Sequence, residues 1–217
     1  MMLEKIFPKI HQEGYKFLII SGLLTLILWS ISNFFGFIFT LITIWVYYFF
    51  RDPERKIIED ENYIVSPADG VISGIKEING PIELGLENTK YTRVSIFMNI
   101  FNCHVNRAPV SGEIEDIFYK PGKFLNASLD KASEENERNY FKLKGIKAPE
   151  PIVVVQIAGL VARRIVTQVN KNETVKQGQR LGIIRFGSRV DVYYTQKKTL
   201  VKVGQNVIAG ESLIASA

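Results

Sequence analysis

The sequence predicts a mostly β domain preceded by an N-terminal hydrophobic helical hairpin. The 34 residues from Phe17 to Phe50 contain no charged side chain. From Tyr63 onward, short β-branched runs alternate with glycine turns, and no long stretch keeps the 3.6-residue apolar period of a helix. We therefore expect a membrane-associating hairpin with basic flanks over residues 1–56 and a β-rich domain over residues 57–217.

The uncharged run is too long for one membrane helix. An α-helix rises about 1.5 Å per residue, so about 20 residues cross a hydrocarbon core of roughly 30 Å. Small and polar residues gather only in the middle of the run, at Ser30, Ser32, Asn33 and Gly36. We expect two apolar arms, 17–31 and 34–50, joined by a turn near Ser32–Asn33. Each arm is short for a full crossing, which leaves a re-entrant or tilted hairpin and two full spans both open.

Basic residues flank the hairpin equally, with three on each side: Lys5, Lys9 and Lys16, then Arg51, Arg55 and Lys56. A single span normally carries its Lys/Arg excess on one side, so this balance favours both ends on the cytoplasmic side of the cell membrane. The apolar stretch is far longer than the core of a signal peptide and lacks a small-residue cleavage site. We therefore expect a retained hairpin with the soluble domain on the cytoplasmic face.

Strands are predicted where β-branched residues cluster between turn residues: 63–65, 71–75, 93–98, 152–157, 163–166, 182–185 and 190–194. The charged segment Ser128–Asn139 is predicted to be a helical or flexible insert. A V-x-x-G-x-x-L unit at Val175–Leu181 recurs 32 residues later at Val207–Leu213. Glycine-turn hairpins of this kind are typical of lipoyl- or biotinyl-carrier-like sandwiches and barrels. Neither turn has the central lysine that carrier function needs.

The composition narrows the possible chemistry. The chain has 217 residues, a net charge of +5 and a single cysteine, Cys103, so an intrachain disulfide and a zinc site built from several cysteines are excluded. The basic residues are dispersed among acidic ones, which argues against nucleic-acid binding. Because neighbouring positions on a strand point to opposite faces, Cys103 is interpreted as packing rather than as a partner of His104.

Four blocks of sequence carry a specific resemblance. They are Arg51-Asp-Pro-Glu-Arg55, Ser66-Pro-Ala-Asp-Gly70, Asn102-Cys-His-Val-Asn-Arg-Ala-Pro-Val-Ser-Gly112 and Arg185-Phe-Gly-Ser-Arg189. Each block is weak by itself, and the last one alone would be read as a β-turn. In this order, behind a membrane hairpin and over nearly the whole chain, they resemble the phosphatidylserine decarboxylase proenzymes of the short bacterial and archaeal-type branch.

The resemblance implies a zymogen that cleaves itself between Gly187 and Ser188. Ser188 would become an N-terminal pyruvoyl group on a small chain, 188–217, which stays bound to the large chain, 1–187. The mature lyase would convert membrane phosphatidylserine to phosphatidylethanolamine and CO2, a step of phospholipid biosynthesis, through a Schiff base to the pyruvoyl group. It would need neither a metal nor pyridoxal phosphate. The oligomeric state stays open.

The chemistry can also be argued from the residues. Decarboxylation of an amino acid leaves a carbanion, which needs an electron sink such as a ketone. A serine hydroxyl is a weak nucleophile without a base. The chain has two histidines, and His11 precedes the hairpin, so His104 is the candidate base in the soluble domain. Asp69 resembles the acidic relay residue of the family, and its alternative role is to accept backbone N–H bonds in its turn.

The sequence departs from the family pattern at one position. Longer members have two histidines three residues apart in the His104 block, and the second one falls on Arg107 here. Either His104 serves both self-cleavage and decarboxylation, or cleavage uses another arrangement. Arg107 is a candidate ligand of the lipid phosphate, as are Arg189 and Arg185. The run Glu134–Asn139 also resembles a family block, with a solvated face as the simpler interpretation.

Two other function classes fit parts of the sequence. A non-enzymatic, membrane-tethered, carrier-like adaptor would keep an intact chain and be indifferent to Ser188→Ala. A phosphocarrier module of the sugar-transport kind would carry phosphate on His104, again without cleavage.

Overall fold

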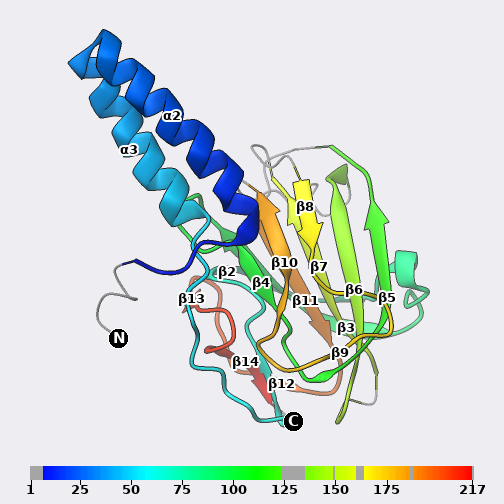
Figure 1. Ribbon diagram of the computed structural model, residues 1–217. Helices are drawn as coiled ribbons and strands as arrows, with labels where there is room; N and C mark the ends of the chain where they lie inside the picture. Colours follow the sequence, from blue (N-terminus) through cyan, green and yellow to red (C-terminus); the bar gives the residue numbers. More distant parts are fainter. Residues whose placement is uncertain (1–6, 124–134, 149, 160–163, 186–187, 217) are drawn as a thin grey trace. The chain divides into compact units, whose positions relative to one another are not determined.

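The computed structural model describes residues 7–123, 135–148, 150–159, 164–185 and 188–216 (Figure 1). The chain forms two compact units, Met1–Glu54 and Arg55–Ala217. The division lies two residues before the boundary expected from the sequence.

The first unit is a pair of apolar helices. After the short 3-10 helix η1 (Gln12–Gly14), α2 spans Tyr15–Ile31 and α3 spans Asn33–Phe49. Ser32 breaks the helix with an extended backbone, where the sequence predicted the turn. Polar contacts join the arms: Thr25 and Thr43 hydroxyls lie 2.9 Å apart, and Trp29 donates to Thr40 at 3.1 Å. The predicted hydrophobic hairpin is confirmed.

One helix in the described part of the chain is long and apolar enough to cross a membrane. The continuous helical stretch Gln12–Ile31 has 20 residues and a mean hydropathy of 1.7, whereas Asn33–Phe49 is shorter.

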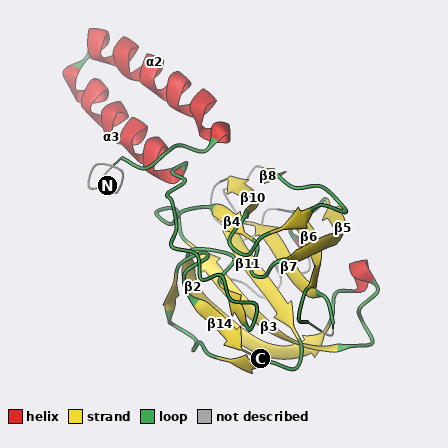
Figure 2. Ribbon diagram, turned by 60° about the horizontal axis from the view of Figure 1, so that its bottom comes forward, coloured by secondary structure: helices red, strands yellow, loops and turns green. Residues whose placement is uncertain are grey.

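The second unit is built from three antiparallel sheets (Figure 2). The largest has eight strands in the order β13 (Asn206–Val207), β2 (Gly70–Asn79), β3 (Lys90–Met98), β11 (Ser188–Tyr194), β7 (Ile152–Ala158), β6 (Arg138–Gly145), β5 (Gly112–Lys120) and β9 (Thr174–Val175). The second has the order β4 (Val105–Arg107), β10 (Arg180–Arg185) and β8 (Arg164–Thr167). The third has the order β1 (Tyr63–Val65), β14 (Leu213–Ser216) and β12 (Lys198–Thr199). The 3-10 helix η2 (Ile82–Leu84) lies between β2 and β3.

The large sheet curls into a half-barrel and buries both of its faces around β11. Val190 and Val192 point into the main core, which they share with Leu181 and Ile184 of the second sheet. Tyr193 points to the opposite face and a smaller cluster around Tyr91. Because side chains alternate along a strand, Ser188 shares the face of Val190, and Arg189 shares the face of Tyr193.

The predicted mostly β class is confirmed, and the seven predicted strands match β1, β2, β3, β7, β8, β10 and β11 in the described residues. The V-x-x-G-x-x-L units form two equivalent turns, with φ of +79° at Gly178 and +77° at Gly210. Part of the insert Ser128–Asn139 lies outside the described residues. Its last two residues, Arg138 and Asn139, are strand and pair with Ile157 and Gln156.

Candidate active site

Ser188 opens β11, between two neighbouring strands. It pairs with Met98 of β3 on one side and with Ala158 of β7 on the other. Its side chain has no solvent-exposed surface, and Oγ has no hydrogen-bond partner among the described residues. Gly187, the other residue of the predicted cleavage site, lies outside the described residues. A buried hydroxyl whose hydrogen-bonding capacity is unused by described groups is unusual and suggests a functional role.

His104 lies just before β4 and is fully buried. Its Nδ1 is 3.0 Å from the backbone oxygen of Asn102. A carbonyl oxygen can only accept, so Nδ1 carries the proton of the neutral ring, and Nε2 is left with the lone pair. The local backbone thus sets the tautomer in which Nε2 can act as a base.

Two contacts link the His104 segment to the strand that precedes Ser188 in the chain and to a strand that pairs with it. Ile184 N–H donates to the His104 oxygen at 3.4 Å, so the ladder between β4 and β10 continues through His104. Strand β10 ends at Arg185, shortly before Ser188. On the other side, the Asn106 amide donates to the sulfur of Met98 at 3.6 Å, and Met98 is the cross-strand partner of Ser188. Residues two apart on an extended chain share a face, so His104 and Asn106 face the same way.

Buried amides continue from Asn106 across the large sheet. Gln156 donates to Asn106 at 2.8 Å, and Asn139 donates to Gln156 and to Thr167, both at 3.3 Å. Neither Asn106 nor Gln156 has exposed surface. Our interpretation of the sequence missed these residues, although a glutamine inside the apolar run Ile152–Ala158 was a signal. The chain of amides fixes the orientation of Asn106 next to the strand pair that holds Ser188.

Asp69 has partners other than the relay contact predicted for it. Oδ2 accepts from Arg55 Nη2 at 2.6 Å, and Oδ1 accepts from the Ala209 N–H at 2.8 Å. Burial lowers the pKa of Arg55, but Asp69 and Cys103 more than offset this and hold that pKa above its ordinary value. The structure therefore does not bring Asp69 to His104 by a direct contact of its carboxylate. It identifies Arg55, from the first sequence block, as an unforeseen member of the site's surroundings.

The two predicted substrate-binding arginines lie in different environments. Arg107 is 5% exposed and donates to the Gly178 oxygen at 2.9 Å. Arg189 is on the face of the sheet opposite to Ser188 and makes a bidentate pair with Asp191, with both bonds 2.7 Å long. Arg107 thus shares the His104 segment, whereas Arg189 is separated from the Ser188 side chain by the sheet itself.

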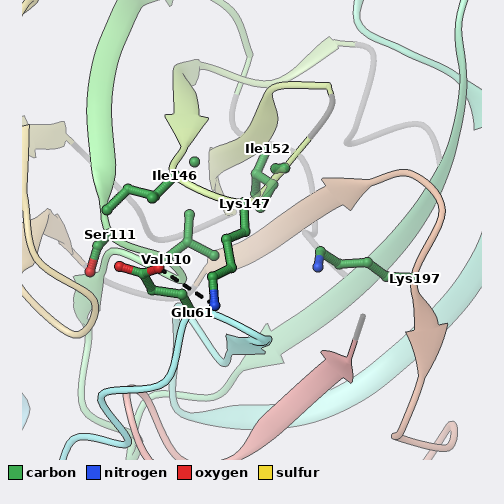
Figure 3. Close-up of a pocket in the computed structure, with 9 residues that line it drawn as sticks. Glu61, Val110, Ser111, Ile146, Lys147, Ile152 and Lys197 are labelled. Carbon is green, nitrogen blue, oxygen red and sulfur yellow. Dashed lines mark ion pairs between the residues drawn. The ribbon is translucent and has the colours of Figure 1, made fainter.

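A small pocket elsewhere in the β unit contains none of the predicted site residues. It has room for about 10 Å³, close to one water molecule. Figure 3 shows Lys147 extending toward Glu61, an ion pair of 3.9 Å. The pocket is too small for a lipid head group.

Within the described residues, no group of three or more His, Cys, Asp or Glu side chains is placed to hold a metal ion. A group derived from Ser188 itself would need no separate pocket for a diffusible cofactor.

The comparisons with known proteins all point to one family, over most or nearly all of the chain. Residues 42–215 match the family model described as phosphatidylserine decarboxylase. A phosphatidylserine decarboxylase proenzyme from Pelagibacter ubique is 62% identical over 99% of this chain and 99% of its own length. Proteins of the same description from Ruegeria pomeroyi and Azorhizobium caulinodans are 50% and 52% identical, over 99% and 98% of this chain and 98% and 91% of their own lengths. The chain belongs to the phosphatidylserine decarboxylase family.

Proposed function

We propose that this chain is a membrane-bound proenzyme that cleaves itself between Gly187 and Ser188 and then decarboxylates phosphatidylserine to phosphatidylethanolamine. The observation that carries the proposal is the buried Ser188 hydroxyl at the start of β11, with the His104 segment paired to the strand before it. The names of the relatives support both the proenzyme and the substrate.

Self-cleavage begins when Ser188 Oγ attacks the Gly187 carbonyl carbon. Nε2 of His104 takes the hydroxyl proton and passes it to the Ser188 nitrogen, so the Oγ–C bond forms, the C–N bond between Gly187 and Ser188 breaks, and an ester remains. Loss of the Ser188 α-proton and cleavage of the Cβ–Oγ bond then release the Gly187 carboxylate and leave dehydroalanine at position 188. Water adds to the imine tautomer of this residue and displaces the former serine nitrogen as ammonia, which leaves the pyruvoyl group.

The surroundings of Ser188 fit a pyruvoyl group at this position. Ser188 Oγ makes no hydrogen bond to a described residue, so loss of the hydroxyl breaks none of the described hydrogen bonds. The ketone of such a group supplies the electron sink for the carbanion that forms when CO2 leaves. In the proposal, His104 Nε2 supplies the proton acceptor for this position, and the burial of β11 between β3 and β7 keeps water out.

Other residues have supporting roles in the proposal. Asp69 holds the Ala209 backbone of the small chain and the Arg55 guanidinium of the large chain. Any relay from Asp69 to His104 would then act through the electrostatic field rather than through a direct bond. Arg107 remains the candidate ligand of the lipid phosphate, and the position of Arg189 does not favour that role. The helix pair holds the chain at the cytoplasmic face of the cell membrane, where the serine head group lies.

Intact mass of the detergent-extracted protein tests the proposal, with the wild type beside Ser188→Ala. We expect two wild-type pieces, 1–187 and a 30-residue piece, 188–217, whose amino end lacks a free amine. Ser188→Ala should stay as one chain and release no CO2 from phosphatidylserine. Ser95→Ala, which changes another buried serine of the large sheet, is the matched control and should be cut. A folded wild type that stays uncut would instead support the tethered adaptor.

A further inference from the structure

A rigid turn joins β3 to β4 immediately before His104. The Asn99 N–H donates to the Asn102 side chain at 2.9 Å, and the Asn102 N–H donates to the Asn99 oxygen at 3.1 Å. The Asn99 side chain also accepts from the Phe101 N–H at 2.8 Å. These bonds close the backbone around the two residues at the tip, Ile100 and Phe101. The fold therefore holds both residues in position.

The tip is apolar and reaches solvent. Phe101 is 69% exposed, the highest value for an aromatic side chain among the described residues of the β unit, and Ile100 is 41% exposed. No Lys, Arg, Asp or Glu occurs between Arg93 and Arg107. Moving the tip into an apolar medium therefore strips water from no charged side chain of this segment, which would otherwise be the main energetic cost.

The turn is also connected to the candidate active site. The Asn102 residue that closes it supplies the oxygen that lies 3.0 Å from His104 Nδ1. Contact at the tip and orientation of the imidazole therefore depend on the same four-residue turn.

We propose that the turn Asn99–Asn102 docks into the surface of the lipid bilayer and brings the His104 site to the head groups. This inference rests on the proposed function, because a decarboxylase of phosphatidylserine needs its active site at the lipid head groups. Two side chains bury far less than the roughly 800 Å² per partner of a stable protein interface. A bilayer suits so small a contact, because the helix pair of the same chain keeps the membrane at a high local concentration.

The first test compares two forms of phosphatidylserine: long-chain lipid in phosphatidylcholine vesicles, and a short-chain lipid dispersed as monomers. The variant Ile100→Asn/Phe101→Asn should lower kcat/KM about tenfold on vesicles only. Ile82→Asn, at an exposed residue (71%) outside the turn, is the matched control and should lower neither. An equal loss on both substrates would mean that the turn acts through His104 alone, and no loss on either would also overturn the proposal.

The second test measures depth directly in the full chain reconstituted into phosphatidylcholine vesicles. A spin label on Phe101→Cys should collide more with oxygen than with a water-soluble nickel chelate, and a label on Ile82→Cys should do the reverse. Cys103 is buried, so the label should go to the new cysteine. Water-like accessibility at position 101, or dipolar broadening from a second copy of the chain, would refute docking. This readout does not need activity. An uncut wild type would therefore contradict the proposed function, while the accessibility of the label would still decide whether the turn docks into the bilayer.

Discussion

His104 is held so that one of its two nitrogens faces the backbone of its own segment. With Nδ1 bonded to the Asn102 oxygen, Nε2 carries the lone pair of the ring and is the nitrogen that accepts the Ser188 proton in the proposed mechanism. Removing the imidazole removes a general base that is typically worth about 10²–10⁴ in rate. His104→Ala should therefore leave a folded precursor that is cut at least about 100-fold more slowly, measured by pulse labelling and gel electrophoresis.

The second histidine provides the control for this prediction. His11 is also buried, but its ring caps the Glu13 N–H in the helix unit. His11→Ala should be cut at the wild-type rate. Cutting of His104→Ala at that same rate would show that self-cleavage uses another base.

Glu83 gives a pH-dependent prediction. Burial tends to raise its pKa, but the Lys120 hydrogen bond and the nearby Arg138, among other contacts, outweigh burial and lower the pKa below its ordinary value of 4.5. A carboxylate with a lowered pKa stabilises the fold above its unfolded pKa, and this contribution is lost as pH falls through the folded value. Glu83→Gln should cost about 1–2 kcal/mol at pH 7, and the difference from wild type should shrink steadily below pH 4.5.

Melting curves from pH 7 down to pH 3 in the Ser188→Ala background measure this effect on uncut chains. Gln at position 83 keeps the shape of the side chain without its charge, so a Tm difference that is independent of pH would assign the role of Glu83 to packing rather than to charge.

The sequence predicted Ser188 and His104 from local blocks, but it could not predict the partners of Asp69. Arg55 lies 14 positions away and Ala209 lies 140 positions away, and no local pattern relates them. Arg189 differs, because its partner Asp191 lies only two positions away on the same strand. The sequence analysis missed this pair because the predicted strand began at Val190, so side-chain alternation was not extended to Arg189.

The paired glycine turns form one structural element with the segment that follows the hairpin. A Cβ on Gly210 would lie 2.6 Å from Ile57 Cδ1, and Ile57 also packs against Gly178. Gly210 has φ of +77°, a conformation that L residues rarely adopt. Gly204 has a similar φ of +87° but open space around it, which makes it the matched control.

We expect Gly204→Ala to cost about 1 kcal/mol through backbone strain alone, and Gly210→Ala to cost about 1–3 kcal/mol more through overpacking. Adding Ile57→Ala should relieve the overpacking, with a coupling energy of about 1–2 kcal/mol in a double-mutant cycle. Thermal unfolding of the four variants in the Ser188→Ala background measures these terms. An equal loss of unfolding free energy for Gly204→Ala and Gly210→Ala would mean that Ile57 moves aside without strain.

At the same scale, the two longest strands that the sequence analysis missed share a physical reason. β5 and β6 carry charges in alternation, and these charges pair across the ladder: Glu113 lies opposite Lys144, and Lys142 contacts Glu115 at 3.3 Å. Considered one strand at a time, these charged residues indicate a solvated segment. They suit a sheet only because each charge on one strand faces an opposite charge on the other, and a single stretch of sequence does not show this. β4 has three residues and is defined by its pairing with β10.

At the scale of the whole β unit, the predicted cleavage falls between two strands of different sheets. β10 belongs to the three-stranded sheet with β4 and β8, whereas β11 lies inside the eight-stranded sheet between β3 and β7. The proposed small chain would contribute β11 and β13 to the large sheet, and β12 and β14 to the sheet with β1. Its strands therefore have large-chain neighbours in two separate sheets.

This arrangement predicts that the cut protein stays together and cannot easily be rebuilt. The piece 188–217 should co-migrate with 1–187 in native gel filtration in mild detergent and separate only under denaturing conditions. After denaturant is removed, the uncut Ser188→Ala chain should refold at a rate independent of concentration. The cut protein should refold slowly and in proportion to concentration, because β11 must find its place between two strands of another chain. Loss of the small piece under native conditions would contradict this prediction, since a strand paired on both sides cannot leave without breaking two ladders.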